Sequence, residues 1–65
     1  MIGVGDYVVY EPYGLGTGVV VMDLGGDMVR VRFARREASV LIDRPRPATE
    51  DEKAAAIAAG ILPKP

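Results

Sequence analysis

The chain has 65 residues with neither cysteine nor histidine, and its formal net charge is -1. Without cysteine it forms no disulfide or thiolate metal site, and without histidine it lacks the commonest general base and metal ligand, so we expect no enzyme, no metal and no cofactor. It is long enough for one small domain, and because no apolar run approaches the ~20 residues of a membrane helix we expect a cytoplasmic protein that does not bind a membrane.

The first part of the chain predicts short β-strands joined by turns. Tyr7 to Tyr10 is rich in aromatic and β-branched residues, which favour extended backbone, and Pro12-Tyr13-Gly14 predicts a turn. A second strand is expected from about Thr17 to Leu24. Gly25-Gly26-Asp27 then predicts a tight hairpin, because successive glycines accept the positive φ that such turns require.

The clearest period in the chain follows this hairpin. Val29, Val31 and Phe33 alternate with Arg30 and Arg32, which is the pattern of a strand with one buried face. We therefore expect the three apolar side chains in the core and the two arginines on the outer face.

A fourth strand is expected from about Ala38 to Ile42, after the polar turn Arg35-Arg36-Glu37. Arg44-Pro45-Arg46-Pro47 ends it, since proline cannot donate to a ladder. The predicted fold class is mostly β, a small SH3-like or Tudor-like barrel of four to five strands over residues 1–47. A capped short helix and tail over residues 48–65 pack on the barrel or on a partner.

The tail changes to helical character. Thr49-Glu50-Asp51-Glu52 matches a capping box, Lys53 to Ala59 is alanine-rich, and Gly60 is a suitable left-handed C-cap. Such a short helix is marginal alone, so it must dock. The apolar edge expected to dock is formed by Ile57, Ile61 and Leu62.

The glycine-rich segment Gly14-Leu15-Gly16-Thr17-Gly18 invites comparison with phosphate-binding loops. A dinucleotide-binding loop opens a helix, whereas Val19-Val20-Val21 follows here and indicates a strand. We interpret the glycines as a turn between two barrel strands.

Six arginines between residues 30 and 46 face only two acids in the same stretch, so one region is basic although the chain is not. Two interpretations stay open: a solvated outer face, or contact with an acidic protein surface or nucleic-acid backbone. Tyr13 is a further candidate, because an aromatic residue beside a proline suits an interface. The candidate binding residues are Arg30, Arg32, Arg35, Arg36, Arg44, Arg46 and Tyr13.

Gly5-Asp6-Tyr7-Val8-Val9-Tyr10, followed by Gly14-Leu15-Gly16, resembles the RNA-polymerase-interacting domain shared by CarD-type transcription regulators and transcription-repair coupling factors. The resemblance spans about residues 3 to 42 and implies a Tudor-like barrel that binds the RNA polymerase β subunit through a sheet edge. A looser likeness, extending to Val29-Arg30-Val31-Arg32-Phe33, is to the Tudor-like tail of UvrD-type helicases. The multi-helix DNA-binding half of CarD has no counterpart here.

Three functional hypotheses follow. The first is a non-enzymatic module that binds a protein of the bacterial transcription or repair machinery, such as RNA polymerase or a repair helicase. The partner would add a strand to the sheet at Met28 to Phe33 or at Ala38 to Ile42. Arg30 and Arg32 would select an acidic partner surface. The second is nucleic-acid binding through the six arginines. The third is an oligomeric enzyme like the plasmid-borne dihydrofolate reductases, although Val40-Leu41-Ile42-Asp43 lacks the glutamine and tyrosine of their pore strand. The sequence favours no oligomeric state.

Overall fold

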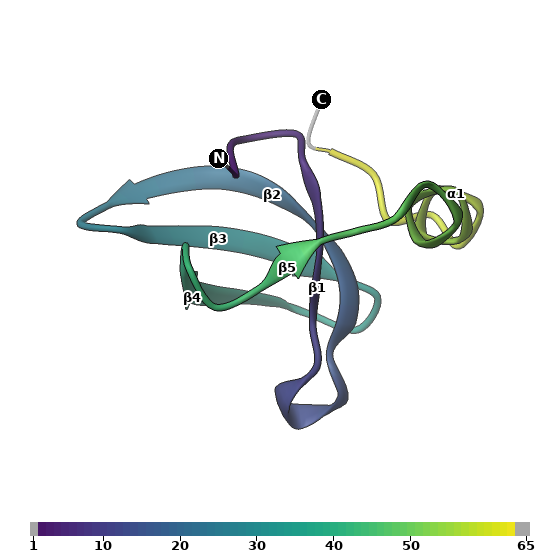
Figure 1. Ribbon diagram of the computed structural model, residues 1–65, viewed down its shortest axis with the longest axis horizontal. Helices are drawn as coiled ribbons and strands as arrows, with labels where there is room; N and C mark the ends of the chain where they lie inside the picture. Colours follow the sequence, from purple (N-terminus) through teal and green to yellow (C-terminus); the bar gives the residue numbers. More distant parts are fainter. Residues whose placement is uncertain (1, 64–65) are drawn as a thin grey trace.

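The computed structural model describes residues 2–63, which form five strands, one 3-10 turn and one α-helix (Figure 1). The sheet is antiparallel, with the strand order β4-β3-β2-β1-β5. The expected mostly β fold with a short C-terminal helix is confirmed. The elements are β1 (Tyr7–Tyr10), η1 (Pro12–Gly14), β2 (Gly16–Gly25), β3 (Met28–Phe33), β4 (Glu37–Leu41), β5 (Arg46–Pro47) and α1 (Glu50–Ala58).

The sheet curls without closing into a hydrogen-bonded barrel. Within residues 2–63 no ladder joins β4 to β5, so these two strands form its edges. β5 is too short to bridge the gap, because it has two residues and one of them is proline. The fifth strand lies in the segment that the sequence predicted only as the end of the fourth strand. There Pro47 pairs with Val8 of β1.

β2 joins the two halves of the sheet. Its first half pairs with β1 and the stretch from Gly18 onward pairs with β3, with register shifts after Val20 and after Asp23. Gly18 lies in the part of β2 that pairs with both β1 and β3. A Cβ atom there would lie 2.6 Å from the Arg32 carbonyl oxygen and 2.8 Å from a ring carbon of Phe33, so the close approach of β2 and β3 requires glycine.

The hairpin and the alternation of β3 agree with the sequence-based predictions. Gly25, Gly26 and Asp27 all have positive φ, at 77°, 58° and 66°. The apolar residues of β3 are buried, and both of its arginines are only partly exposed. These local features were predictable because a two-residue period and a glycine turn depend on neighbours within a few residues.

The core has two parts on opposite faces of β1 and β2. Successive strand residues point to opposite faces, so Val8 and Val20 face one part while Tyr7 and Val19 face the other. The larger part is formed by Val8, Val20, Val29, Val31, Phe33 and Val40. The smaller part, formed by Tyr7, Val19, Ala56 and Ile61, lies beneath α1.

The helix begins with the predicted capping box and ends at the predicted left-handed glycine. Thr49 Oγ1 accepts from the Glu52 N–H, and Glu52 Oε1 accepts from the Thr49 N–H at 2.8 Å. Gly60 has φ 86°, and the Ile61 N–H returns to the Ala56 carbonyl at 3.0 Å.

Of the three residues of the expected docking edge, Ile61 is the one that packs on the sheet. Ile61 is buried, but Ile57 is 44% exposed and Leu62 is 47% exposed. The reversal at Gly60 bonds Ile61 to Ala56, so Ala56 and Ile61 together contact the sheet. The small Ala56 side chain allows the helix to approach Tyr7 and Val19 closely.

Candidate binding surfaces

β3 is an inner strand, paired with β2 on one side and β4 on the other. Sheet augmentation along Met28 to Phe33, one of the two expected modes, is therefore wrong, because the backbone hydrogen bonds on both sides of β3 are already used.

Arg30 and Arg32 do lie on the outer face, but both contact one carboxylate of the same chain. Arg30 Nε donates to Glu37 Oε1 at 2.6 Å, and Arg32 Nε donates to Glu37 Oε2 at 3.2 Å. Arg32 Nη1 also donates to the Leu62 carbonyl at 3.0 Å, which attaches the chain beyond the helix to β3. The two guanidinium groups therefore join β3, β4 and the C-terminal turn.

Arg46 is held by the helix. Its guanidinium donates to both Glu52 carboxylate oxygens, at 2.9 and 2.7 Å, so the contact is a bidentate pair. The Arg46 side chain, followed by the Thr49 backbone N–H, lowers the pKa of the Glu52 carboxyl from its usual 4.5 to about 2. Glu52 in turn raises the pKa of Arg46. This pair connects β5 to the first turn of α1.

The six arginines differ in their contacts with carboxylates. Arg44 lies 4.0 Å from Asp43, and both side chains are largely exposed. Arg35 and Arg36 have no carboxylate within 4.0 Å among residues 2–63. The arginines of β3 and of β5 belong to different ion pairs, because Glu37 lies on β4 and Glu52 lies on α1.

Arg35 and Arg36 lie beside Tyr13, the other predicted binding residue. The η1 loop and the β3–β4 turn together line a hollow of about 440 Å³ that also contacts Leu15 and Phe33. Tyr13 is 85% exposed and has φ 61°, which is an uncommon backbone conformation for an aromatic residue. We name Tyr13, Arg35 and Arg36 the Tyr13 site.

The open edge of β4 presents backbone groups to solvent. The Phe33 N–H donates to Arg36 at 2.8 Å and the Ile42 N–H donates to Asp27 at 2.7 Å, one bond at each end of the β3–β4 ladder. Because bonded and non-bonded pairs alternate in an antiparallel ladder, the intervening Arg30–Ser39 pair is non-bonded. The N–H and C=O of Ser39 therefore point away from β3.

The opposite edge, β5, is different. The Ala48 N–H donates to Tyr7 at 3.0 Å, which makes the next pair along, Val8 with Pro47, non-bonded. The backbone of Pro47 therefore points away from β1, and proline has no N–H to donate. Of the two edges, only β4 can accept a further strand with a regular ladder.

Apolar side chains accompany the β4 edge on the outer face. Met28 lies opposite Leu41, and Met22 lies opposite Arg30. Leu41 is 39% exposed, Met22 is 44% exposed and Met28 is partly exposed. We name Met22, Met28 and Leu41 the outer apolar strip. Sequence reasoning missed it, because the register shift after Val20 places Met22 outward and no local pattern shows that shift.

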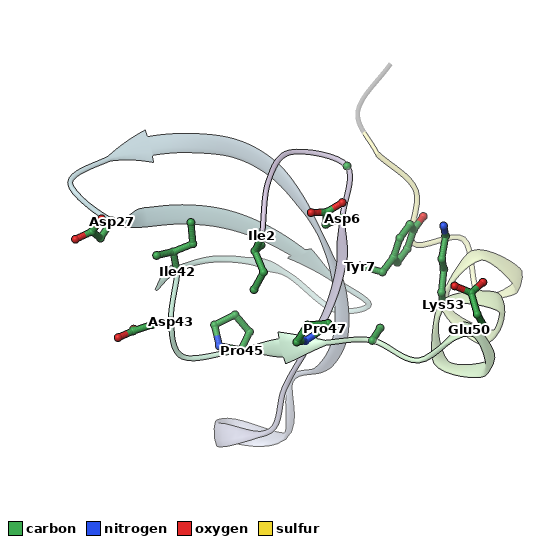
Figure 2. A pocket seen from close by; sticks show the side chains of 12 residues that line it. Ile2, Asp6, Tyr7, Asp27, Ile42, Asp43, Pro45, Pro47, Glu50 and Lys53 are labelled. Carbon is green, nitrogen blue, oxygen red and sulfur yellow. The ribbon is translucent and has the colours of Figure 1, made fainter.

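A groove of about 640 Å³ lies between the N-terminal segment, the link from β4 to β5 and the first turn of α1. Figure 2 shows Asp27 and Asp43 at one end, Ile2 near the middle and Glu50 at the other end. We name it the acidic groove. It is lined by Ile2, Gly5, Asp6, Tyr7, Asp27, Ile42, Asp43, Pro45, Pro47, Ala48, Glu50 and Lys53.

The sequence offered little sign of this groove. Its carboxylates follow four separate turns or element starts, where solvation or capping explains each one alone. Ile2 and Ile42 are 40 positions apart, and the fold brings both against the larger core.

None of the helices described in residues 2–63 is long and apolar enough to cross a membrane. Comparisons of this chain with family models, with curated proteins and with solved structures found no match.

Proposed function

We propose that the chain is a non-enzymatic interaction module that binds an extended segment of a partner protein along the β4 edge. The observation that supports this most is the contrast between the two sheet edges. Ser39 presents a backbone donor and acceptor to solvent, whereas the corresponding position of β5 is Pro47. An added strand gains main-chain hydrogen bonds at β4 and cannot gain a regular set at β5.

The outer apolar strip supports the same surface. A strand added to β4 places alternate side chains over the outer face, next to Leu41 and Met28. Exposed apolar side chains gathered in one place are typical of interaction surfaces, and methionine adapts to partners of different shape. Main-chain pairing then supplies affinity, and the strip selects an apolar residue in the partner.

The partner class comes from the sequence resemblance. A chain similar to the polymerase-interacting domain of CarD-type regulators has the RNA polymerase β subunit, or a repair helicase, as its proposed partner in the bacterial cytoplasm. Arg30 and Arg32 both contact Glu37, so selection of an acidic partner by these two arginines would compete with that carboxylate.

The test uses purified bacterial RNA polymerase immobilised on a biosensor and the full chain in solution. Ser39→Pro removes the outward N–H without removing a β3–β4 bond, whereas Ser39→Ala keeps it. We expect binding by the original chain and by Ser39→Ala, and loss of binding by Ser39→Pro. An amide NMR spectrum establishes that each variant is folded.

Two results contradict the proposal. If folded Ser39→Pro binds polymerase as well as Ser39→Ala does, the β4 edge is not the contact. If the original chain binds neither the polymerase nor a repair helicase, the assignment to transcription and repair fails.

A second candidate function is nucleic-acid binding, and the geometry favours the Tyr13 site for it over the full arginine set. Arg35 and Arg36 have no acidic side chain within 4.0 Å in the described part of the chain, and they flank an exposed ring on which a base can stack.

Two phosphate contacts on a single strand predict a slope of about -1.4 for the logarithm of affinity against the logarithm of salt concentration. Anisotropy with a labelled single-stranded oligonucleotide measures this slope. Arg35→Gln with Arg36→Gln should remove the binding, whereas Arg44→Gln should not. Absence of binding at low salt excludes the candidate.

A further inference from the structure

We propose that the acidic groove binds an extended peptide whose apolar centre is flanked by basic side chains. Its lining includes neither Ser39 nor the outer apolar strip, although Asp27 and Ile42 adjoin Met28 and Leu41 in the sequence. Three properties of the groove lead to the proposal: its apolar floor, the carboxylates at its two ends and the proline at its sheet edge.

The floor of the groove is apolar and rigid. Ile2 and Ile42 are partly buried against the larger core, so each presents the remainder of its side chain to the groove. Pro45 is buried and Pro47 belongs to β5, and their rings restrict the backbone. A volume of about 640 Å³ accommodates several side chains without a large rearrangement.

The ends of the groove are negative. Asp27 has no basic group within 4.0 Å among residues 2–63, and Asp43 has only the exposed Arg44 at that distance. Figure 2 shows both carboxylates at the end of the groove remote from α1.

On the helix side of Ile2, Figure 2 shows Asp6 near the middle of the groove, and Glu50 with Lys53 beside α1. Lys53 Nζ lies 5.8 Å from the centroid of the Tyr7 ring, which is a cation–π arrangement. The groove therefore has excess negative charge on both sides of Ile2, because Asp6 and Glu50 outnumber Lys53 on the helix side, and this complements a ligand with two cationic groups.

An elongated peptide fits this distribution better than other cations. Among residues 2–63 no three carboxylates gather closely enough to hold a metal ion. A nucleic acid is disfavoured because its phosphates meet carboxylates at both ends. Since Pro47 offers no outward N–H, the peptide is recognised by its side chains and does not extend the sheet.

The test uses a fluorescein-labelled peptide, Gly-Lys-Leu-Pro-Val-Leu-Lys-Gly, titrated with the full chain and followed by anisotropy at low salt. Two further peptides separate the contributions: one has glutamate in place of both lysines, and the other has glycine and serine in place of the four central apolar residues. We expect binding of the first peptide only, with amide shift changes confined to the groove residues in the NMR spectrum.

A pair of charge-matched double variants then locates the site. Asp27→Asn with Asp43→Asn removes two charges from the groove, and asparagine tolerates the positive φ of residue 27. Glu11→Gln with Asp51→Asn removes two exposed charges outside it. The first pair should weaken binding about tenfold and the second by less than about twofold.

The proposal fails if both pairs weaken binding equally, if the glycine–serine peptide binds as tightly as the first, or if the first peptide does not bind. Ser39→Pro distinguishes this site from the β4 edge, because it should leave the peptide affinity unchanged whether or not it affects a protein partner.

Discussion

The Tyr7 hydroxyl donates a buried hydrogen bond of 2.8 Å to the carbonyl oxygen of Ile61, 54 positions along the chain. This bond joins β1 to the turn after α1, and the Tyr7 ring packs with Val19, Ala56 and Ile61. The helix is therefore attached to the sheet by this buried bond and a small apolar cluster, together with the exposed Arg46–Glu52 pair and the Arg32–Leu62 hydrogen bond.

Tyr7→Phe should lower the free energy of unfolding by about 1 kcal/mol, because the Ile61 carbonyl loses its buried donor while the ring packing remains. Tyr10→Phe serves as the control, since the Tyr10 hydroxyl forms no hydrogen bond with any of residues 2–63. Urea unfolding measures both. Equal stability of the two variants would show that the Tyr7–Ile61 bond contributes nothing.

Gly18→Ala should lower the free energy of unfolding by about 2–3 kcal/mol. The added Cβ would lie 2.6 Å from the Arg32 carbonyl oxygen, a backbone atom that cannot rotate away. Gly3→Ala is the matched control, because its Cβ meets only Asp6 Oδ2 at 4.0 Å, and it should change the stability by less than about 0.5 kcal/mol. Thermal unfolding distinguishes the two, and a neutral Gly18→Ala would contradict the close β2–β3 approach.

The Arg46–Glu52 pair predicts a pH dependence. The folded state lowers the pKa of Glu52 to about 2, so the ionised carboxylate stabilises the fold above pH 4.5, and this stabilisation is lost as pH falls from 4.5 toward about 2. Glu52→Gln keeps an acceptor for the capping box but removes the charge. The original chain should have the higher melting temperature at neutral pH, and the difference should shrink across that window.

Asp51→Asn is the control for this experiment, because Asp51 lies in the same helical turn and forms no salt bridge with a described residue. Its difference from the original chain should be smaller. A Glu52→Gln difference that stays constant from pH 6 to pH 2 would mean that the pair does not stabilise the fold.

Glu37→Gln should release the two arginines of β3 from their shared carboxylate. We expect a loss of about 1 kcal/mol in the free energy of unfolding, since the contacts are charge-assisted but partly exposed. We also expect tighter binding to heparin, because Arg30 and Arg32 become available to a polyanion. Glu11→Gln changes the net charge equally and should bind heparin more weakly than Glu37→Gln.

Local order was determined by the sequence. The two-residue alternation of β3 predicted which side chains are buried, the glycines at 25 and 26 predicted the hairpin, and Thr49 with Glu52 predicted the capping box. Each of these features depends on backbone preferences and contacts within about five residues, so it is present in the sequence pattern itself.

The surfaces were decided only by the tertiary structure. That β3 is an inner strand and β4 an edge depends on strand order, which no alternation of side chains records. Glu37 contacts Arg30 and Arg32 because β4 lies in a particular register, and Ile2 and Ile42 pack against the same core because the fold brings both to it. The sequence shows a basic region but not the ion pairs of its arginines. Ion pairs form between residues that the fold brings together, so the tertiary structure decided which arginines contact a carboxylate.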